Sequence, residues 1–410
     1  MANTLISYDG IPTYLNNDDI TTPYFATNAY SGFIYLNTNC NKTFWNCTKI
    51  TDWNFLNKFN WDNVIDCFRM FWNCSNLNQP ITIGNNVTNC SNMFSSCKNL
   101  NQPINIPDNV TDCSSMFSFC FNLNQSITIG NNVTDCSNMF RNCNSFNQLI
   151  TIPNKVTNCD WMFDACDNFN QLITIPNSVI DISGIFYNCP NFNQPITIPN
   201  SVTSCASIFA SCDNFNQPIT IPNSVTDISG MFAHCNNFNQ PVTIPNSVTS
   251  CRGMFNHCPN FNQPINIPNS VTDCSFMFFN TKSFNQPITI PDSVTSCINM
   301  FTNCDNLNQP VIIGNNVISC YHMFTSCDSF NSPVTIGNNV NTCYNMFMFC
   351  NNFNQPITIP NSVNNCRGMF DSCKNMRSVV RLPNKFNNGR TNNFWLSCPV
   401  SVENHTLVFY

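Results

Sequence analysis

The stretch FNQPITIPNSVTDISGMFAHCNN, residues 215–237, decides the fold because it recurs along the chain at a fixed spacing. Its clearest marker is the phenylalanine that usually follows a methionine, which returns every 23 residues from Phe71 to Phe370. We call this residue the marker phenylalanine. A unit this short cannot bury its apolar side chains alone and must stack on copies of itself. The sequence therefore predicts a repeat solenoid with a 23-residue period.

The chemistry of the unit predicts the two sides of this solenoid. Ile-Thr-Ile, as at residues 196–198, alternates apolar and polar side chains, which is typical of a short strand with its isoleucines facing inward. Pro195 and Pro199 limit that strand to about three residues. The Cys-x-x-Met-Phe-x-x-Cys pattern places apolar groups on one face of a short helical turn. We expect a leucine-rich-repeat-like solenoid, with short parallel strands on one side, short helical turns on the other, and threonine and asparagine ladders between coils.

Both ends of the chain depart from the repeat. Residues 1–40 lie outside it and are expected to form an N-terminal cap or attachment arm. Residues 41–373 form the predicted solenoid, whose first unit, residues 41–66, is degenerate and rich in bulky aromatic residues. Residues 374–410 form a predicted C-terminal cap. Terminal repeats are expected to be atypical because one of their faces meets solvent.

The cysteines follow the repeat. The chain has 28 of them, and most lie either four residues before the marker phenylalanine or three residues after it. Ile182 and Ile228 replace the first cysteine of a unit and Thr281 replaces the second, in each case without loss of the other cysteine. This pattern favours buried, reduced thiols stacked in two ladders. Some disulfides and a metal site remain alternatives.

Composition and motifs exclude several functional classes. Only 9% of the residues are charged, the net charge of −6 is spread thinly, and no basic stripe indicates nucleic-acid binding. No apolar run is long enough to span a membrane, and the start of the chain lacks the pattern of a secretion signal. We therefore expect synthesis in a reducing cytoplasm and a virion or intracellular location. No catalytic constellation appears, so no enzyme activity and no cofactor is expected.

The repeat resembles known families. Ile-Pro-Asn-Ser-Val-Thr followed by Cys, Met-Phe and x-x-Cys is similar to the BspA-type leucine-rich repeat. Residues 132–140, NVTDCSNMF, are closer still to the variant repeated in mycoplasma-type surface lipoproteins. The resemblance implies surface adhesion or recognition, and similar repeats occur in phage and large-virus proteins. This chain departs from the pattern by lacking an export or lipidation signal and by carrying methionine where the family usually has alanine.

Sequence variation among the copies indicates where a partner binds. The strand threonine hardly changes, whereas the residues beside the marker phenylalanine vary and include aromatic residues and arginine, which are enriched at interface hot spots. The candidate interaction surface comprises Phe119, Trp161, Tyr187, Arg252, Phe276, Tyr321, His322, Tyr344, Phe349 and Arg367. The alternative is that these are scattered side chains on a tolerant coil.

Two smaller features are also candidates. A basic segment of the C-terminal cap either is a solvated face or contacts an acidic partner, and it comprises Arg377, Arg381, Lys385 and Arg390. His234 and His257 occupy the same position in adjacent units and should stack about 5 Å apart. They are either surface histidines or a metal pair, for which a third ligand is lacking.

These observations favour a non-enzymatic recognition or structural solenoid. The leading hypothesis is a phage or virus component, such as a fibre, a decoration protein or a receptor-contacting module, or a host-attachment protein that binds protein or glycan surfaces. Its termini would then join it to a virion or another assembly. An alternative is an intracellular protein–protein interaction scaffold from an AT-rich genome. A more distant alternative is an ice-binding solenoid that uses the threonine ladder. The sequence leaves the oligomeric state open.

Overall fold

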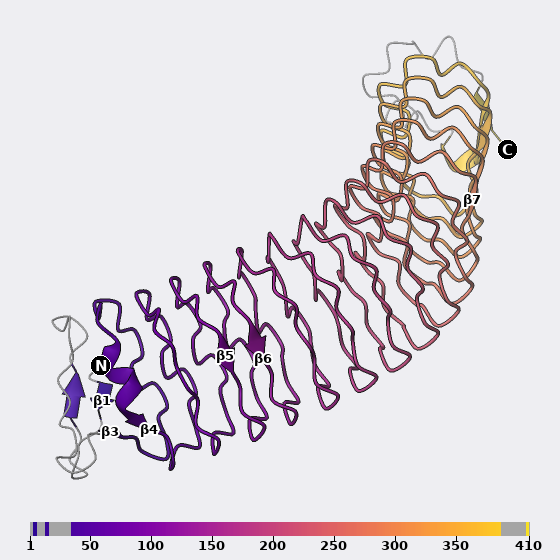
Figure 1. Cartoon of the computed structure of the whole chain (residues 1–410). Coiled ribbons are helices and arrows are strands. Elements are labelled where there is room, and N and C mark those ends of the chain that lie inside the picture. Colours follow the sequence, from indigo (N-terminus) through magenta and orange to yellow (C-terminus); the bar gives the residue numbers. More distant parts are fainter. Residues whose placement is uncertain (1–2, 6–12, 16–33, 387–406, 410) are drawn as a thin grey trace. The chain divides into compact units, whose positions relative to one another are not determined.

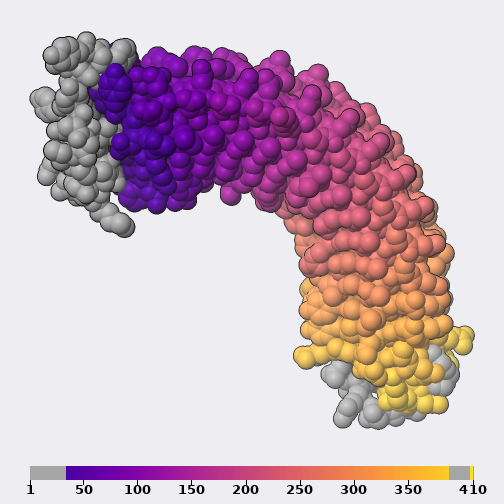
Figure 2. All heavy atoms as spheres, turned by 90° about the horizontal axis from the view of Figure 1, so that it is seen from below, coloured from indigo at the N-terminus to yellow at the C-terminus, as the bar shows by residue number. Residues whose placement is uncertain are grey.

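The computed structural model describes residues 3–5, 13–15, 34–386 and 407–409. The chain divides into two compact units, Met1–Val202 and Thr203–Tyr410. Within each unit the chain winds into stacked coils, one per repeat, as Figure 1 shows. Figure 2 shows successive coils of a unit in close contact and in chain order. The predicted repeat solenoid is confirmed.

The described part of the first unit contains short strands and one 3-10 helix. Strands β1 and β2 pair antiparallel, with Asn3 opposite Leu15. Strands β3 and β4 pair parallel, as do β5 and β6, where Ile104 lies opposite Ile127. The bounds of these elements are β1 (Asn3–Leu5), β2 (Thr13–Leu15), β3 (Ile34–Tyr35), η1 (Asn54–Lys58), β4 (Phe59–Asn60), β5 (Ile104–Asn105) and β6 (Ile127–Thr128).

The second unit has two parallel sheets in its described part. Their strand orders are β7-β8-β9 and β10-β11-β12, so each strand lies beside the strand of a neighbouring coil. A 3-10 helix, η2, follows β11. The bounds are β7 (Ile288–Thr289), β8 (Val311–Ile312), β9 (Val334–Thr335), β10 (Ile357–Thr358), β11 (Val380–Leu382), η2 (Asn384–Phe386) and β12 (Leu407–Phe409).

The strand side is more irregular than expected. Residues 196–198 form no strand, although Ile196 and Ile198 are buried and Thr197 is exposed, as predicted. Three parallel pairs, β5–β6, β7–β8 and β8–β9, have a glycine two residues after the second strand. A Cβ at Gly130 would collide with the carbonyl oxygen of Pro107 in the preceding coil. Glycine therefore permits a close approach of the two backbones at this position. Most coils carry proline there, and β11 pairs with β10 although Pro383 occupies the same position.

The opposite side consists of hydrogen-bonded turns, not the short helical turn that the apolar spacing predicts. The N–H of Met93 donates to the carbonyl of Cys90 within the turn, and the N–H of Phe94 donates to Met116 in the next coil at 2.9 Å. Asn92 has a φ of 55°, which a right-handed helix does not allow. Alternate N–H groups are thereby turned toward the next coil, and the apolar side chains still face the core.

Columns of phenylalanine fill the core. Marker phenylalanines of successive coils stack nearly parallel, as in Phe71 and Phe94, whose ring centroids are 5.5 Å apart at an interplanar angle of 4°. A second column forms from the phenylalanine that opens the Phe-Asn-Gln segment, as in Phe169 and Phe192 at 6.1 Å. These rings are completely buried. Burial of so much aromatic surface is the main stabilising term of each unit.

The cysteines form the predicted ladders of buried thiols. In the described part of the chain they carry no disulfide, and Cys398 lies outside that part. The thiol of Cys97 donates to the carbonyl oxygen of Phe71, one coil earlier, at 3.0 Å. Burial raises the pKa of the Cys97 thiol to about 12. Thiols whose pKa is raised in this way stay protonated at neutral pH and are chemically unreactive.

Side-chain ladders also connect the coils. The N–H of Asn101 donates to Oδ1 of Asn78 at 2.9 Å, and this pairing recurs along both units, as expected for the asparagines. The threonine ladder forms at a different position from the predicted one. The hydroxyl of Thr134 donates to the carbonyl of Thr111 at 3.1 Å, and both residues follow the buried valine instead of lying in the strand. The strand threonines are consequently left facing solvent.

The degenerate first unit stacks like a regular coil. Phe44 lies 5.2 Å from Phe71 and Trp45 lies 5.5 Å from Trp72, measured between ring centroids. The additional residues of this unit include η1. Most of residues 1–40 and of residues 374–410 lies outside the described part, so the roles of both caps stay predictions. No helix in the described residues has the length and hydrophobicity needed to cross a membrane.

Candidate functional site

The predicted interaction residues lie on the turn side, which we define as the residues from three before to two after each marker phenylalanine. Within this segment the residues two before and two after the marker usually have positive φ values. Trp161, at φ 53°, and Phe349, at φ 61°, are examples. The tight turns hold large side chains at the surface, and 43% of Phe349 is exposed. Regular backbone bonds between coils therefore present variable side chains at fixed spacing.

In the first unit the structure brings together Trp161 and Tyr187. Their ring centroids are 5.1 Å apart at an interplanar angle of 55°. Gly184 lies beneath the indole, and an added Cβ would come within 2.7 Å of its ring carbons. The glycine is therefore required for this aromatic pair. Phe119 lies apart from them, edge-on to Phe121 at 6.3 Å.

In the second unit three predicted residues form one aromatic cluster. Tyr321 and Tyr344 stack at 5.2 Å and 7°, and the ring of His322 meets Tyr321 edge-on at 4.3 Å. Nδ1 of His322 lies 3.0 Å from the hydroxyl of Thr325, which fixes the ring orientation. Burial lowers the pKa of His322 below its ordinary value, which favours the neutral ring. Arg367 occupies the next coil at the position of the two tyrosines and is exposed.

A groove crosses the turn side of the second unit. Its volume is about 440 Å³, and we call it the turn-side groove. It runs over successive coils because several of them carry glycine, alanine or serine beside the marker phenylalanine. The lining residues are Ser207, Ser229, Gly230, Ala233, Arg252, Gly253, Asn256 and Phe276.

Two predicted residues close one end of this groove. The guanidinium carbon of Arg252 lies 4.9 Å from the ring centroid of Phe276, a cation–π arrangement. Nη1 of the same arginine lies 3.8 Å from Oδ2 of Asp273. Contacts on both sides restrict the arginine, and the nearby carboxylate balances its charge. The end of the groove consequently offers both hydrogen-bond donors and acceptors.

A row of rings extends from Phe276, which lines this groove. Phe276 and Phe279 are 5.9 Å apart, Phe279 and His257 are 5.3 Å apart, and His257 stacks on His234 at 4.4 Å, all measured between ring centroids. Burial and the neighbouring His234 lower the pKa of His257, so its ring is neutral at neutral pH. The predicted stacking of the histidines is confirmed. Among the described residues no cluster of three or more His, Cys, Asp or Glu side chains could hold a metal.

The predicted basic segment of the cap forms bonds within its own chain. Nη1 of Arg377 donates to the carbonyl of Met376 at 2.8 Å, and Nζ of Lys385 donates to the carbonyl of Asn361 at 2.6 Å. Arg381 lies exposed in β11. Arg390 lies outside the described residues. An acidic partner for this segment stays a prediction.

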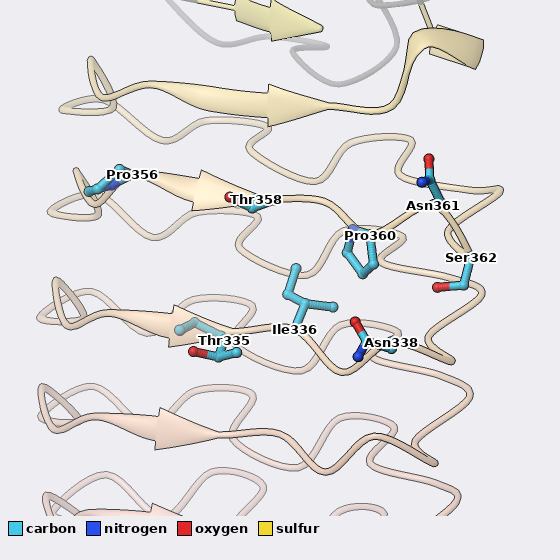
Figure 3. A pocket seen from close by; sticks show the side chains of 9 residues that line it. Thr335, Ile336, Asn338, Pro356, Thr358, Pro360, Asn361 and Ser362 are labelled. Atoms are coloured by element: carbon cyan, nitrogen blue, oxygen red, sulfur yellow. The ribbon is translucent and has the colours of Figure 1, made fainter. Parts of the chain in front are cut away.

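A second hollow lies on the strand side, between the coils of β9 and β10, and has a volume of about 590 Å³. Figure 3 shows Thr335 and Thr358 on successive coils. Ile336 and Pro360 lie farther along these coils, on the side toward Ser362. None of its lining residues is charged or aromatic. It is larger than the turn-side groove but presents the side chains that the repeat carries in nearly every coil. We therefore take the turn side as the candidate site.

The residues on the floor of the turn-side groove were not predicted from the sequence. Large variable side chains mark the predicted surface, whereas Ser207, Gly230 and Gly253 form the floor of the groove because their side chains are small. All three occupy the position two residues before the marker phenylalanine, in consecutive coils. The run of small residues at one repeat position is the sequence signal that could have indicated this floor.

Stacked coils with short parallel strands, tight turns and an aromatic core define a leucine-rich-repeat-like solenoid. The chain belongs to the family described as Mycoplasma protein of unknown function, DUF285. The family model matches residues 38–152, 129–223, 157–266, 203–313, 226–336 and 290–384. The predicted resemblance to mycoplasma-type repeats agrees with this match. A comparison with curated proteins gives no match.

Solved structures of bacterial repeat proteins are similar in fold. A leucine-rich repeat protein from Bacteroides ovatus shares 19% sequence identity, with a TM-score of 0.56 over 80% of this chain and 87% of that one. One from Eubacterium ventriosum shares 19% identity at a TM-score of 0.44, over 71% of this chain and 82% of that one. A leucine rich cell surface protein from Faecalibacterium prausnitzii shares 17% at a TM-score of 0.38, over 80% and 83%. At 19% identity, the similarity to the Bacteroides ovatus structure supports the fold alone.

Proposed function

We propose that this protein is a non-enzymatic recognition solenoid that binds a protein or glycan surface through its turn side. One observation carries the proposal. Aromatic and arginine side chains gather on the turn side in contact with one another, as in Tyr321 and Tyr344, whereas the strand side repeats one exposed threonine. Such side chains dominate the binding energy of most protein interfaces.

The order of the turn side supports the same conclusion. Binding costs free energy when flexible side chains must be immobilised. Stacking of Tyr321 on Tyr344 and of Arg252 on Phe276 restricts these side chains before any partner arrives. Backbone bonds between coils also fix the spacing of the positions that carry them. A surface ordered in this way loses little conformational entropy on binding.

The finer form of the proposal is host attachment, either within a phage or virus particle or on its own. It is supported by the absence of catalytic motifs and by the resemblance of the repeats to those of surface proteins. An intracellular interaction scaffold is the alternative. Sedimentation separates the two, because a particle component co-sediments with particles whereas a scaffold stays in the soluble fraction.

Paired variants test the use of the turn side. The immobilised protein is exposed to fractionated surface proteins and to a glycan array, and the affinity for any captured partner is compared among variants. The double variant Tyr321→Ser and Tyr344→Ser should weaken binding by about 2 kcal/mol, the cost of losing hot-spot residues. Serine occupies the same position at Ser114 and Ser137, so the fold tolerates the change.

The matched control changes the strand side in neighbouring coils. Thr335→Ala and Thr358→Ala remove exposed hydroxyls without touching the turn side. This double variant should bind like the unchanged protein. If the threonine variant loses the partner and the tyrosine variant keeps it, the turn side is not the recognition surface.

A further inference from the structure

We infer that the turn-side groove of the second unit binds an uncharged saccharide, an inference that rests on the proposed recognition function and names the ligand of one part of its surface. The groove combines a charge-balanced polar end, a floor of small residues and a lining ring, Phe276, from which a row of further rings extends. Each of these three features restricts the class of ligand.

The polar end favours an uncharged ligand. Arg252 lies 3.8 Å from Asp273, so the guanidinium offers donors while its charge is already balanced. The hydroxyl of Ser229, which lines the groove and lies 2.9 Å from that of Ser250, can donate and accept. An anion would have to compete with Asp273 for the arginine. Sugar hydroxyls, which both donate and accept, match this mixed set of groups.

The floor argues against an added peptide strand. Strand addition requires backbone N–H and C=O groups that have no partner. The N–H of Gly230 instead donates to Arg252 in the next coil at 2.8 Å, and the N–H of Gly253 donates to Ser275 at 2.9 Å. Side chains must therefore supply the hydrogen bonds to a ligand at this floor. Recognition through side chains suits a saccharide better than an extended peptide.

Phe276 supplies an apolar surface in the lining of the groove. Phe276 and Phe279 are joined to the stacked pair of His257 and His234 by ring contacts of 4.4 to 5.9 Å. Burial keeps His257 neutral at neutral pH, and Nδ1 of His257 contacts Oδ1 of Asn256, which lines the groove. Small-ligand sites commonly combine apolar walls with a few oriented polar groups. One apolar face of a sugar ring fits against the half-buried ring of Phe276.

Titration with defined probes tests the inference on the full chain. The neutral probes are maltotriose, cellotriose and triacetylchitotriose, the anionic probes are N-acetylneuraminic acid and tetraglutamate, and binding is followed by saturation-transfer NMR. At least one neutral saccharide should bind, and the anionic probes should not bind more tightly. Binding of anionic probes alone, or of no probe, overturns the inference.

A groove-filling variant locates the binding. Gly230→Asn and Gly253→Asn together place bulk on the floor at φ values of 62° and 61°. Asparagine already occupies the same repeat position with positive φ at Asn92 and Asn299, so the backbone accepts the change. The variant should lose about tenfold or more in saccharide affinity, equivalent to the loss of one or two good hydrogen bonds. Unchanged affinity overturns the assignment to this groove.

Ser115→Asn is the matched control, because it adds the same side chain at the same repeat position in the first unit, also at positive φ. It should leave saccharide affinity unchanged. An equal loss in this control means that the ligand does not occupy the groove. If no saccharide binds while the tyrosine double variant still loses a captured partner, the saccharide inference fails and the recognition function stands.

Discussion

The hydroxyl of Thr281 donates a hydrogen bond of 2.6 Å to the carbonyl oxygen of Phe255, one coil earlier. In the preceding coil the thiol of Cys258 makes the same bond to Phe232 at 2.8 Å. The second cysteine position of the repeat therefore requires a small side chain with a hydrogen-bond donor. The first position is different, since Ile182 and Ile228 fill it without a donor.

Substitution at Cys97 tests this requirement. Cys97→Thr should change the free energy of unfolding only slightly, because its hydroxyl can donate to Phe71 as the thiol does. Cys97→Val has nearly the same shape but no donor, and should lower the free energy of unfolding by about 1 kcal/mol relative to threonine. Urea denaturation of the two variants measures the difference. Equal stability would show that the position selects size alone.

The thiol ladders should resist alkylation until the protein unfolds. Burial raises the pKa of the Cys258 and Cys320 thiols to about 12, and only the thiolate reacts at a useful rate. Mass spectrometry after iodoacetamide treatment should find Cys258, Cys320 and the other cysteines whose pKa burial raises unmodified in the native protein and modified in denaturant without reductant. Cysteines that stay blocked in denaturant until reductant is added would reveal disulfides and contradict the ladder.

Arg141 should stabilise the buried carboxylate of Asp164. Its Nε lies 2.8 Å from Oδ2 of Asp164, whose side chain is only 7% exposed. Burial raises the pKa of Asp164, and Arg141 opposes that increase. Arg141→Ser should lower the free energy of unfolding by about 2 kcal/mol at neutral pH, because a buried charge loses its partner.

The double variant Arg141→Ser and Asp164→Ser is the control for this pair. Ser95 and Ser118 occupy the same repeat position and are buried, so the double variant should recover most of the lost stability. The deficit of the single variant should also shrink at acidic pH, where Asp164 is protonated and carries no charge. A deficit that is independent of pH and persists in the double variant would point to lost packing instead.

The histidine stack should make stability depend on pH. Burial and His234 lower the pKa of His257 in the folded protein, so the unfolded chain binds a proton more readily. Stability is complete above the unfolded-state pKa of about 6.5 and declines as pH falls below it. His257→Asn, which copies Asn280 in the next coil, should reduce this decline. Melting temperatures across this pH range measure it, and an unchanged slope would exclude His257 as the cause.

Much of the fold was predictable because the copies of the repeat show both a regular spacing and informative substitutions. Period, core residues and thiol ladders followed from the spacing alone, and replacement by Ile228 showed that no disulfide was needed at that position. The helical turn was a wrong prediction because apolar spacing is the same in a helix and in consecutive tight turns. Positive φ at Asn92 and its equivalents distinguishes the tight turns from a helix. Asparagine, serine and glycine at that repeat position were a sequence indication of positive φ.

The candidate site was predictable only in part. Variation among copies pointed to Arg252 and Phe276, and the structure places both in the lining of one groove. The groove itself depends on the absence of side chains at Gly230 and Gly253. Missing side chains do not stand out in the sequence as large residues do. The groove they leave becomes visible only when the coils are stacked.

Recognition through the turn side is tested most directly by a contact map of the protein bound to its captured partner, obtained by crystallography or by cross-linking with mass spectrometry. We predict contacts on the turn side, at positions such as Arg252, Tyr321 and Tyr344. Contacts concentrated on the strand threonines, such as Thr335 and Thr358, would contradict it.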